Sequence, residues 1–154
     1  MLTCLPKSPC SWSFWVRNDD DEVAAEVHFN VLTEQGQIIV GPNGYSVVKH
    51  GWLSGHWSLD HDGQAIVNAT KNNPFARSFE LSNDSAQWTL RAQSLFTRCF
   101  DLSEAGSPRG TIYPKHPFTR RSVIDCDSAV PTLIQLFAFW LVVLTWRRAA
   151  NNNS

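Results

Sequence analysis

A chain of 154 residues has the length of one domain and is long enough to bury a core. Hydrophobic residues make up 43% of it and charged residues 18%, which is typical of a folded domain. The net charge of −1 argues against a strong nucleic-acid binder, which normally carries an excess of Lys and Arg.

Charge is uneven along the chain, with 5 Lys/Arg against 10 Asp/Glu in residues 1–87 and 8 against 4 in residues 88–154. One interpretation is a basic patch that faces anionic lipid. The other is that the two halves of one domain differ by chance and interleave in space. Sequence alone leaves both open, because surface charge cannot be placed without a fold.

The four cysteines show neither a CxxC pair nor the spacing of a zinc site. Cys4 and Cys10 are near enough to pair, but free thiols are favoured. The N-terminus lacks the basic start and apolar core of a secretory signal peptide, and Pro6 and Pro9 interrupt it. We therefore expect a cytoplasmic protein, with association at a membrane left open.

Residues 1–22 are predicted to be an irregular leader, because prolines punctuate them and they end in the acidic run at 18–22. Trp12, Phe14 and Trp15 are the exception. They form either a short strand packed on the body of the domain or a segment outside it.

From Val23 the pattern favours short strands. Residues 25–31 alternate with period 2, and turn signals follow at 34–37, 41–44, 60–63 and 71–74. Between and after the turns we predict strands at 38–40, 45–49, 56–59, 64–70 and 77–81. Short strands at this spacing indicate a sandwich or barrel.

An internal repeat supports this β class. Residues 45–81 align without gaps on residues 88–124 at an offset of 43. Identities fall at turn positions: Gly63 matches Gly106, Pro74 matches Pro117, Phe75 matches Phe118 and Arg77 matches Arg120. The repeat predicts a duplicated four-strand unit, as found in symmetric sheets.

The apolar segment from Val130 to Arg148 is the longest predicted helix. Asp127 or Ser128 is expected to cap it and Pro131 to occupy its first turn. A polar tail at 151–154 is predicted to be disordered. A helix that is apolar on every side must be buried in protein or in lipid.

Both environments are open for this helix. Trp140, Trp146 and the pair Arg147-Arg148 favour a membrane anchor. The roughly 16 helical residues from Pro131 to Trp146 span roughly 24 Å, which is short for a bilayer core of about 30 Å. A sheet closed into a barrel around the helix would bury it and also remove the strand edges, so we favour that fold.

The order Trp88-Thr-Leu-Arg, Phe100-Asp-Leu, Gly106, Gly110-Thr-Ile-Tyr-Pro, Phe118-Thr-Arg-Arg and Phe139-Trp-Leu-Val-Val-Leu-Thr-Trp-Arg-Arg resembles the tubby C-terminal-like superfamily. That superfamily includes tubby, phospholipid-scramblase and LURP-one-related proteins, and the likeness is to small bacterial members. It implies a mainly β fold: a closed antiparallel barrel of about twelve short strands around the hydrophobic helix 131–148, within one domain at residues 23–150. The phosphoinositide pocket of tubby and the calcium segment of scramblases have no residue-for-residue match in this chain.

The candidate ligand-binding residues form a basic set suited to an anionic headgroup. They are Lys115, His116, Arg120, Arg121, Lys71 and Arg77. An alternative for Arg77 and Arg120 is a structural role, because the repeated turn would itself require an arginine at both positions.

No motif indicates catalysis, a metal site or a cofactor: Gly-x-Ser-x-Gly, GxxxxGK and GxGxxG are all missing. His56 and His61 with Asp60 and Asp62 are explained by a turn. We therefore predict a non-enzymatic barrel that binds anionic lipid or a hydrophobic ligand at a membrane surface. The alternatives are a small membrane protein with a β-rich cytosolic domain and a C-terminal anchor, and a small enzyme of unrecognised type.

Overall fold

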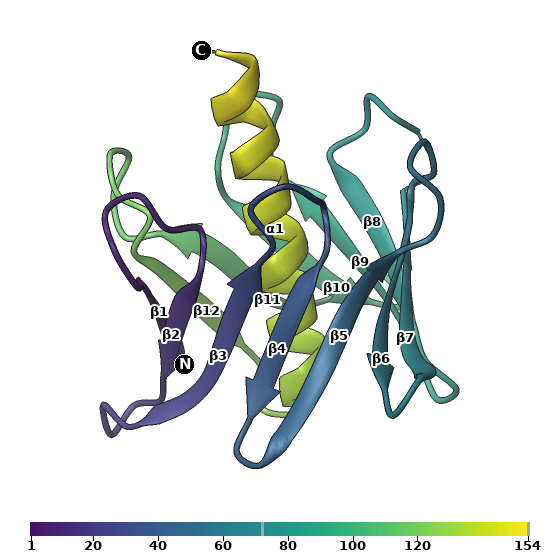
Figure 1. Ribbon diagram of the computed structural model, residues 1–154, viewed down its shortest axis with the longest axis horizontal. Coiled ribbons are helices and arrows are strands. Elements are labelled where there is room, and N and C mark those ends of the chain that lie inside the picture. Colours follow the sequence, from purple (N-terminus) through teal and green to yellow (C-terminus); the bar gives the residue numbers. More distant parts are fainter. Residues whose placement is uncertain (72, 154) are drawn as a thin grey trace.

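Twelve strands form one closed antiparallel barrel around a C-terminal helix in a computed structural model, which describes residues 1–71 and 73–153 (Figure 1). The strands are β1 (Leu2–Pro6), β2 (Phe14–Arg17), β3 (Val23–Phe29), β4 (Gly36–Val40), β5 (Asn43–Lys49), β6 (His56–His61), β7 (Gln64–Thr70), β8 (Ser78–Ser82), β9 (Gln87–Ala92), β10 (Phe100–Glu104), β11 (Ser107–Pro114) and β12 (Ser122–Cys126). The predicted fold class is confirmed.

Each strand pairs with its neighbours in the chain, and β1 pairs with β12 to close the barrel. The closing register joins Leu2 to Ile124 and Cys4 to Ser122. The prediction of an irregular leader at residues 1–22 was therefore wrong, because this segment supplies β1 and β2. The two strands are only five and four residues long, which is too short for the alternation of buried and exposed residues to stand out.

The helix α1 spans Thr132–Asn152, and Pro131 is its N-cap without a side-chain cap. The expected cap at Asp127 instead accepts a hydrogen bond from the backbone N–H of Ala129. The helix also continues beyond Arg148 into the expected polar tail, of which Ser154 lies outside the described residues.

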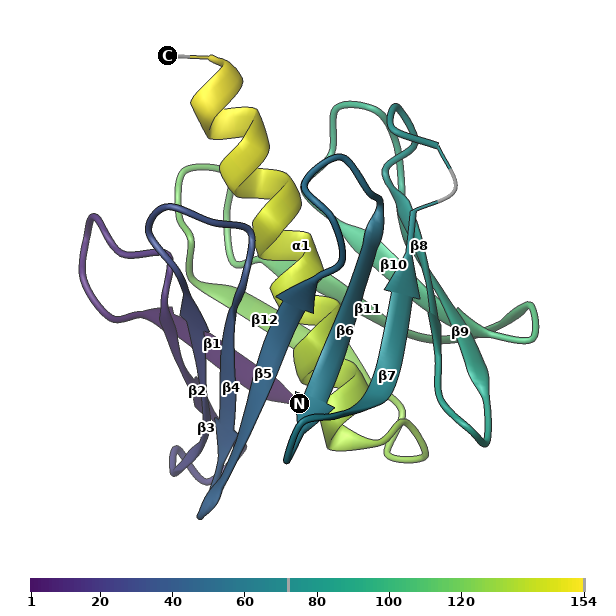
Figure 2. The ribbon, with the colours of Figure 1, turned by 45° about the vertical axis from the view of Figure 1, so that its right-hand side comes forward.

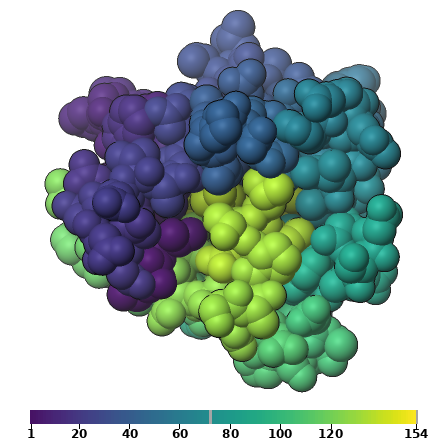
Figure 3. All heavy atoms as spheres, turned by 90° about the horizontal axis from the view of Figure 1, so that it is seen from below, coloured from purple at the N-terminus to yellow at the C-terminus, as the bar shows by residue number. Residues whose placement is uncertain are grey.

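Twelve residues of α1 are buried, including Phe139 and Trp140. Phe139 meets Phe14 of β2 edge to face, with ring centroids 5.0 Å apart. Trp140 stacks on Phe29 of β3 at 4.4 Å and donates its indole N–H to the carbonyl of His28. Seen along the barrel, the first part of α1 fills the centre of the ring of strands (Figure 3).

The sequence repeat corresponds to strands that occupy equivalent positions. An offset of 43 carries β5, β6, β7 and β8 onto β9, β10, β11 and β12. The turn residues Gly63 and Gly106 both have positive φ, at 77° and 81°, a conformation that glycine adopts without steric cost. The turn expected at 71–74 lies within the connection 71–77, where Asn72 is outside the described residues.

The connections alternate between the two ends of the barrel. Six longer loops, 7–13, 30–35, 50–55, 71–77, 93–99 and 115–121, gather at the end where α1 emerges (Figures 1 and 2). The opposite end carries the shorter connections 18–22, 41–42, 62–63, 83–86, 105–106 and 127–131. This arrangement follows from an antiparallel meander, in which every second connection returns to the same end.

Candidate functional site at the loop rim

We call the six longer loops, together with the end of α1 from Thr145, the loop rim. Its first property is exposed apolar surface. Of eleven exposed large hydrophobic residues in the described part of the chain, eight lie here: Val31, Leu32, Trp52, Leu53, Phe75, Leu95, Phe96 and Phe118. These are 76% to 96% exposed, whereas Met1, Trp15 and Val23 elsewhere are 36% to 56% exposed. Exposed apolar side chains are thus concentrated at one end of the molecule.

The apolar residues recur at regular intervals along the chain. Leu32, Leu53, Phe75, Phe96 and Phe118 each lie on a different loop and are 21 or 22 residues apart. This interval is one β-hairpin, half of the repeat recognised in the sequence. Five of the six loops therefore present an apolar tip, and the loop 7–13 contributes the half-buried Trp12 instead.

The second property is charge. Within the described residues the loop rim carries nine Lys/Arg side chains and the single acidic side chain of Glu34. The short connections at the opposite end carry seven acidic side chains and no Lys or Arg. The basic set is Lys7, Lys71, Arg77, Arg98, Lys115, Arg120, Arg121, Arg147 and Arg148, and the acidic set is Asp19, Asp20, Asp21, Glu22, Asp62, Asp84 and Asp127. Charge is therefore separated between the two ends of the barrel, because alternate connections of both sequence halves lie at opposite ends.

Arginine side chains connect three of the rim loops to the loop that follows them around the barrel. Arg77 donates to the carbonyls of Ser94 and Leu95 in the adjacent loop, at 3.1 and 2.9 Å. Arg98 donates in the same way to Pro117 and Thr119 at 3.0 and 2.9 Å. These contacts order the loops, since a charged donor satisfies several loop carbonyls at once.

Arg120 repeats this contact across the closure of the barrel, where it donates to the carbonyls of Ser11 and Pro9. Its guanidinium also lies 5.0 Å from the centre of the Trp12 ring. From α1, Arg147 donates to the carbonyls of Asn30 and Val31 at 2.9 and 2.7 Å. These bonds fix the helix end to the loop 30–35.

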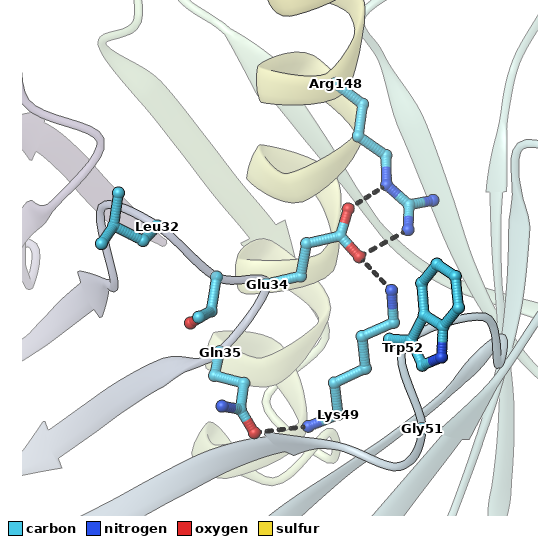
Figure 4. Close-up of a pocket in the computed structure, with 8 residues that line it drawn as sticks. Leu32, Glu34, Gln35, Lys49, Gly51, Trp52 and Arg148 are labelled. Atoms are coloured by element: carbon cyan, nitrogen blue, oxygen red, sulfur yellow. Dashed lines mark hydrogen bonds and ion pairs between the residues drawn. The ribbon is translucent and has the colours of Figure 1, made fainter.

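Glu34, in the loop 30–35, joins the helix to the end of β5 through an ion-pair cluster (Figure 4). Its oxygens accept from Nε and Nη2 of Arg148 at 2.5 and 2.7 Å, and Oε2 accepts from Nζ of Lys49 at 2.5 Å. Burial raises the pKa of Glu34, but the hydrogen bonds from Arg148 and Lys49 outweigh it and bring the pKa to about 2. Glu34 therefore stays ionised at any physiological pH.

The six predicted ligand-binding residues all lie on the rim, but they do not form one cluster. Lys71 and Arg77 belong to the loop 71–77, and the other four belong to the loop 115–121. The loop 93–99 lies between these two loops. Lys115, His116 and Arg121 are exposed, Lys71 is half-buried, and the guanidinium groups of Arg77 and Arg120 bind loop carbonyls.

Sequence reasoning missed Arg98, Lys49, Glu34 and Arg148. Arg98 is the middle member of a Phe-x-Arg series at Phe75, Phe96 and Phe118, which a search at a 22-residue period would have found. The other three come from distant segments, so only the fold brings them together.

One polar network on the outer wall contains residue types used in catalysis. The Ser58 hydroxyl lies 2.6 Å from Nε2 of His50 and donates to Oδ1 of Asp60 at 2.6 Å. Serine is the middle member, so its proton is held by the carboxylate, whereas a hydrolytic triad places histidine there. Ser58 is also fully buried. Among residues 1–71 and 73–153, no group of three or more His, Cys, Asp or Glu side chains is placed to hold a metal ion.

The chain matches no protein-family model, no curated protein and no solved structure. The resemblance to the tubby C-terminal-like superfamily thus stays a prediction that rests on the sequence motifs alone.

Proposed function

We propose that the protein is a non-enzymatic module that binds peripherally to a membrane, with the loop rim facing an anionic lipid surface. The observation that carries the proposal is the coincidence of two features at one end of the barrel. Eight exposed apolar residues and nine Lys/Arg side chains occupy the rim, while the opposite end is acidic.

Both features match the chemistry of a membrane surface. Aromatic and aliphatic side chains at loop tips gain free energy by entering the interfacial region. A Lys or Arg near an anionic leaflet contributes about 1 kcal/mol of attraction. A charge separation of this kind also orients the molecule before contact.

The loop contacts of the arginines are compatible with this role. A hydrogen bond to a neutral carbonyl occupies donors of Arg77, Arg98, Arg120 and Arg147 without cancelling their charge. Among the described rim residues, Arg148 is paired with the carboxylate of Glu34 at 2.5 Å and Lys7 with that of Glu26 at 3.6 Å. The same arginines therefore order the loops and contribute to the positive field.

Vesicle co-sedimentation tests the proposal. We expect binding to vesicles that contain phosphatidylglycerol, weaker binding at high salt, and little binding to pure phosphatidylcholine. Phe96→Ser should lower the affinity by about 1–2 kcal/mol, roughly 5- to 30-fold, because it removes an apolar tip. Val23→Ser, which changes an exposed residue of β3 away from the rim, is the matched control and should leave the affinity unchanged.

Absence of binding to phosphatidylglycerol vesicles at low salt would exclude the proposal. An equal effect of Phe96→Ser and Val23→Ser would also contradict it, since the rim would then have no special part.

Extraction from membranes separates this function from the anchor alternative. By length and composition α1 can cross a bilayer, but twelve of its residues are buried within the barrel. A rim-docked protein should be released by high salt and carbonate. A requirement for detergent would favour the anchor.

A further inference from the structure

Two adjoining cavities open on the rim between the loops 30–35, 50–55 and 71–77 and the end of α1. Their volumes are about 530 and 220 Å³, and Lys49, Trp52 and Arg148 line both. Figure 4 shows the residues that line the larger cavity. Glu34 lines the larger cavity, and Lys71 lines the smaller one. We call the pair of cavities the rim pocket.

The rim pocket has an excess of positive charge. Its ionised side chains are the three cations Lys49, Lys71 and Arg148 and the carboxylate of Glu34. Glu34 binds Lys49 and Arg148 directly. The ammonium of Lys71 lies 5.8 Å from the centre of the Phe79 ring and makes no ion pair within 4 Å among the described residues. Two positive charges thus remain uncompensated.

The cations of the rim pocket also retain hydrogen-bond donors. Arginine has five N–H groups and the carboxylate of Glu34 engages two nitrogens of Arg148, while Lys49 gives it one of three N–H groups. Glu34 holds both cations in fixed positions at the border of the two cavities. Burial, together with the positive charge of Arg148, lowers the pKa of Lys71, so an incoming anion would relieve an existing repulsion.

We propose that the rim pocket binds the phosphomonoester group of a lipid headgroup. A phosphomonoester carries about −1.5 to −2 charges at neutral pH, which matches the excess of two positive charges, whereas a phosphodiester carries one. Arg and Lys supply charge-assisted hydrogen bonds to phosphate oxygens. The exposed Trp52 and Leu53 border the smaller cavity, so the acyl chains of a bound lipid would leave toward the apolar tips. The inference rests on the proposed docking of the rim.

The experiment compares vesicles that contain phosphatidic acid with vesicles that contain phosphatidylglycerol, at matched surface charge. Wild-type protein should bind phosphatidic acid vesicles about tenfold more tightly, the effect of one added charge-assisted contact. Lys71→Gln should reduce this preference to less than about twofold by removing that contact. Lys115→Gln removes the same charge from an exposed rim position outside the pocket, so it should weaken binding to both vesicles equally and keep the preference.

Three results would overturn the inference. The first is equal affinity of the wild type for the two vesicles. The second is loss of the preference in Lys115→Gln as well as in Lys71→Gln. The third is displacement by soluble glycerol 3-phosphate at micromolar concentration, which would show that the pocket takes a free phosphate and not a lipid. Binding to both vesicles without preference leaves rim docking intact, whereas binding to neither contradicts rim docking itself. A thermal unfolding curve that matches the wild type ensures that Lys71→Gln reports on the pocket.

Discussion

At the scale of single residues, Gly36 shows why a glycine can mislead. The sequence Glu34-Gln35-Gly36-Gln37 predicts a turn, but Gly36 begins strand β4. A Cβ at this position would lie 2.0 Å from the carbonyl oxygen of His28 and 2.8 Å from Nε1 of Trp140. Glycine is required here because the indole of Trp140 must reach that carbonyl from inside the barrel.

Gly36→Ala should therefore destabilise the protein by about 2–4 kcal/mol, since backbone or the central helix must move. Gly44→Ala is the matched control in the adjacent strand, where an added Cβ meets no atom within 4 Å. Urea unfolding of both variants measures the difference. Equal midpoints for the two variants would contradict the close packing of Trp140 against β3 and β4.

The ion pairs of Glu34 predict acid sensitivity. Its folded pKa of about 2 is lower than the ordinary value near 4.5, so ionised Glu34 stabilises the folded state above that ordinary value. This contribution is lost as the pH falls from about 4.5 to about 2, and partial exposure limits it to about 1–2 kcal/mol. Glu34→Gln should remove that part of the pH dependence in urea titrations between pH 7 and pH 3. Asp20→Asn, on an exposed turn, should leave the pH dependence as it is.

At the scale of elements, the presence of a strand was easier to predict than its first and last residues. The segment Gln64–Thr70 was predicted with its observed bounds, and the predicted bounds of β3 to β6 and β8 differ from the observed ones by a few residues. The strands β9 to β12 were predicted only through the repeat at residues 88–124, without bounds of their own. The missed strands, β1 and β2, are held by pairing with β12 and with each other rather than by a strong local pattern. Strand formation there depends on partners that are distant in sequence.

The helix α1 is the element on which the barrel depends most. A chain that ends at Asp127 should not fold, because each large apolar side chain buried from α1 contributes about 2 kcal/mol and twelve residues are lost, against a total stability of about 5–15 kcal/mol. A chain that ends at Arg148 should fold, since residues 149–153 are exposed. Amide dispersion in NMR spectra distinguishes the two. A soluble, folded fragment 1–127 would contradict a core built around α1.

Three of the rim loops repeat the same side-chain arrangement. Each Phe-x-Arg loop places an apolar side chain outward and an arginine toward the next loop. The 43-residue repeat revealed two of these loops at Arg77 and Arg120, but the intervening Arg98 escaped notice. Adjacent hairpins resemble each other in sequence only at their loop tips, so the 22-residue period is weak in the strands.

At the scale of the whole molecule, the separation of charge between the two ends predicts that the position of an arginine decides its effect on vesicle binding. Arg121→Gln on the rim and Arg17→Gln at the turn end of β2 remove the same charge. Only Arg121→Gln should weaken binding to anionic vesicles, by about 1 kcal/mol or fivefold, because only the rim faces the lipid in the proposed orientation. A titration of each variant with anionic vesicles at low ionic strength measures the two affinities. Equal losses would indicate that net charge, and not its position, governs association.

The sequence by itself determined the β class, the repeat of four strands and the need of the apolar helix for burial in protein or in lipid, because periodicity and hydrophobicity are local properties of the chain. It also identified six residues of the rim as candidate ligand-binding residues: Lys71, Arg77, Lys115, His116, Arg120 and Arg121. Only the tertiary structure decided that residues 1–22 close the barrel, that Lys49, Lys71, Arg148 and Glu34 meet, and that the charges separate by end. In an antiparallel meander, successive connections lie at opposite ends of the barrel. Loop residues one hairpin apart in the sequence therefore lie at the same end, and the turns between them lie at the other end.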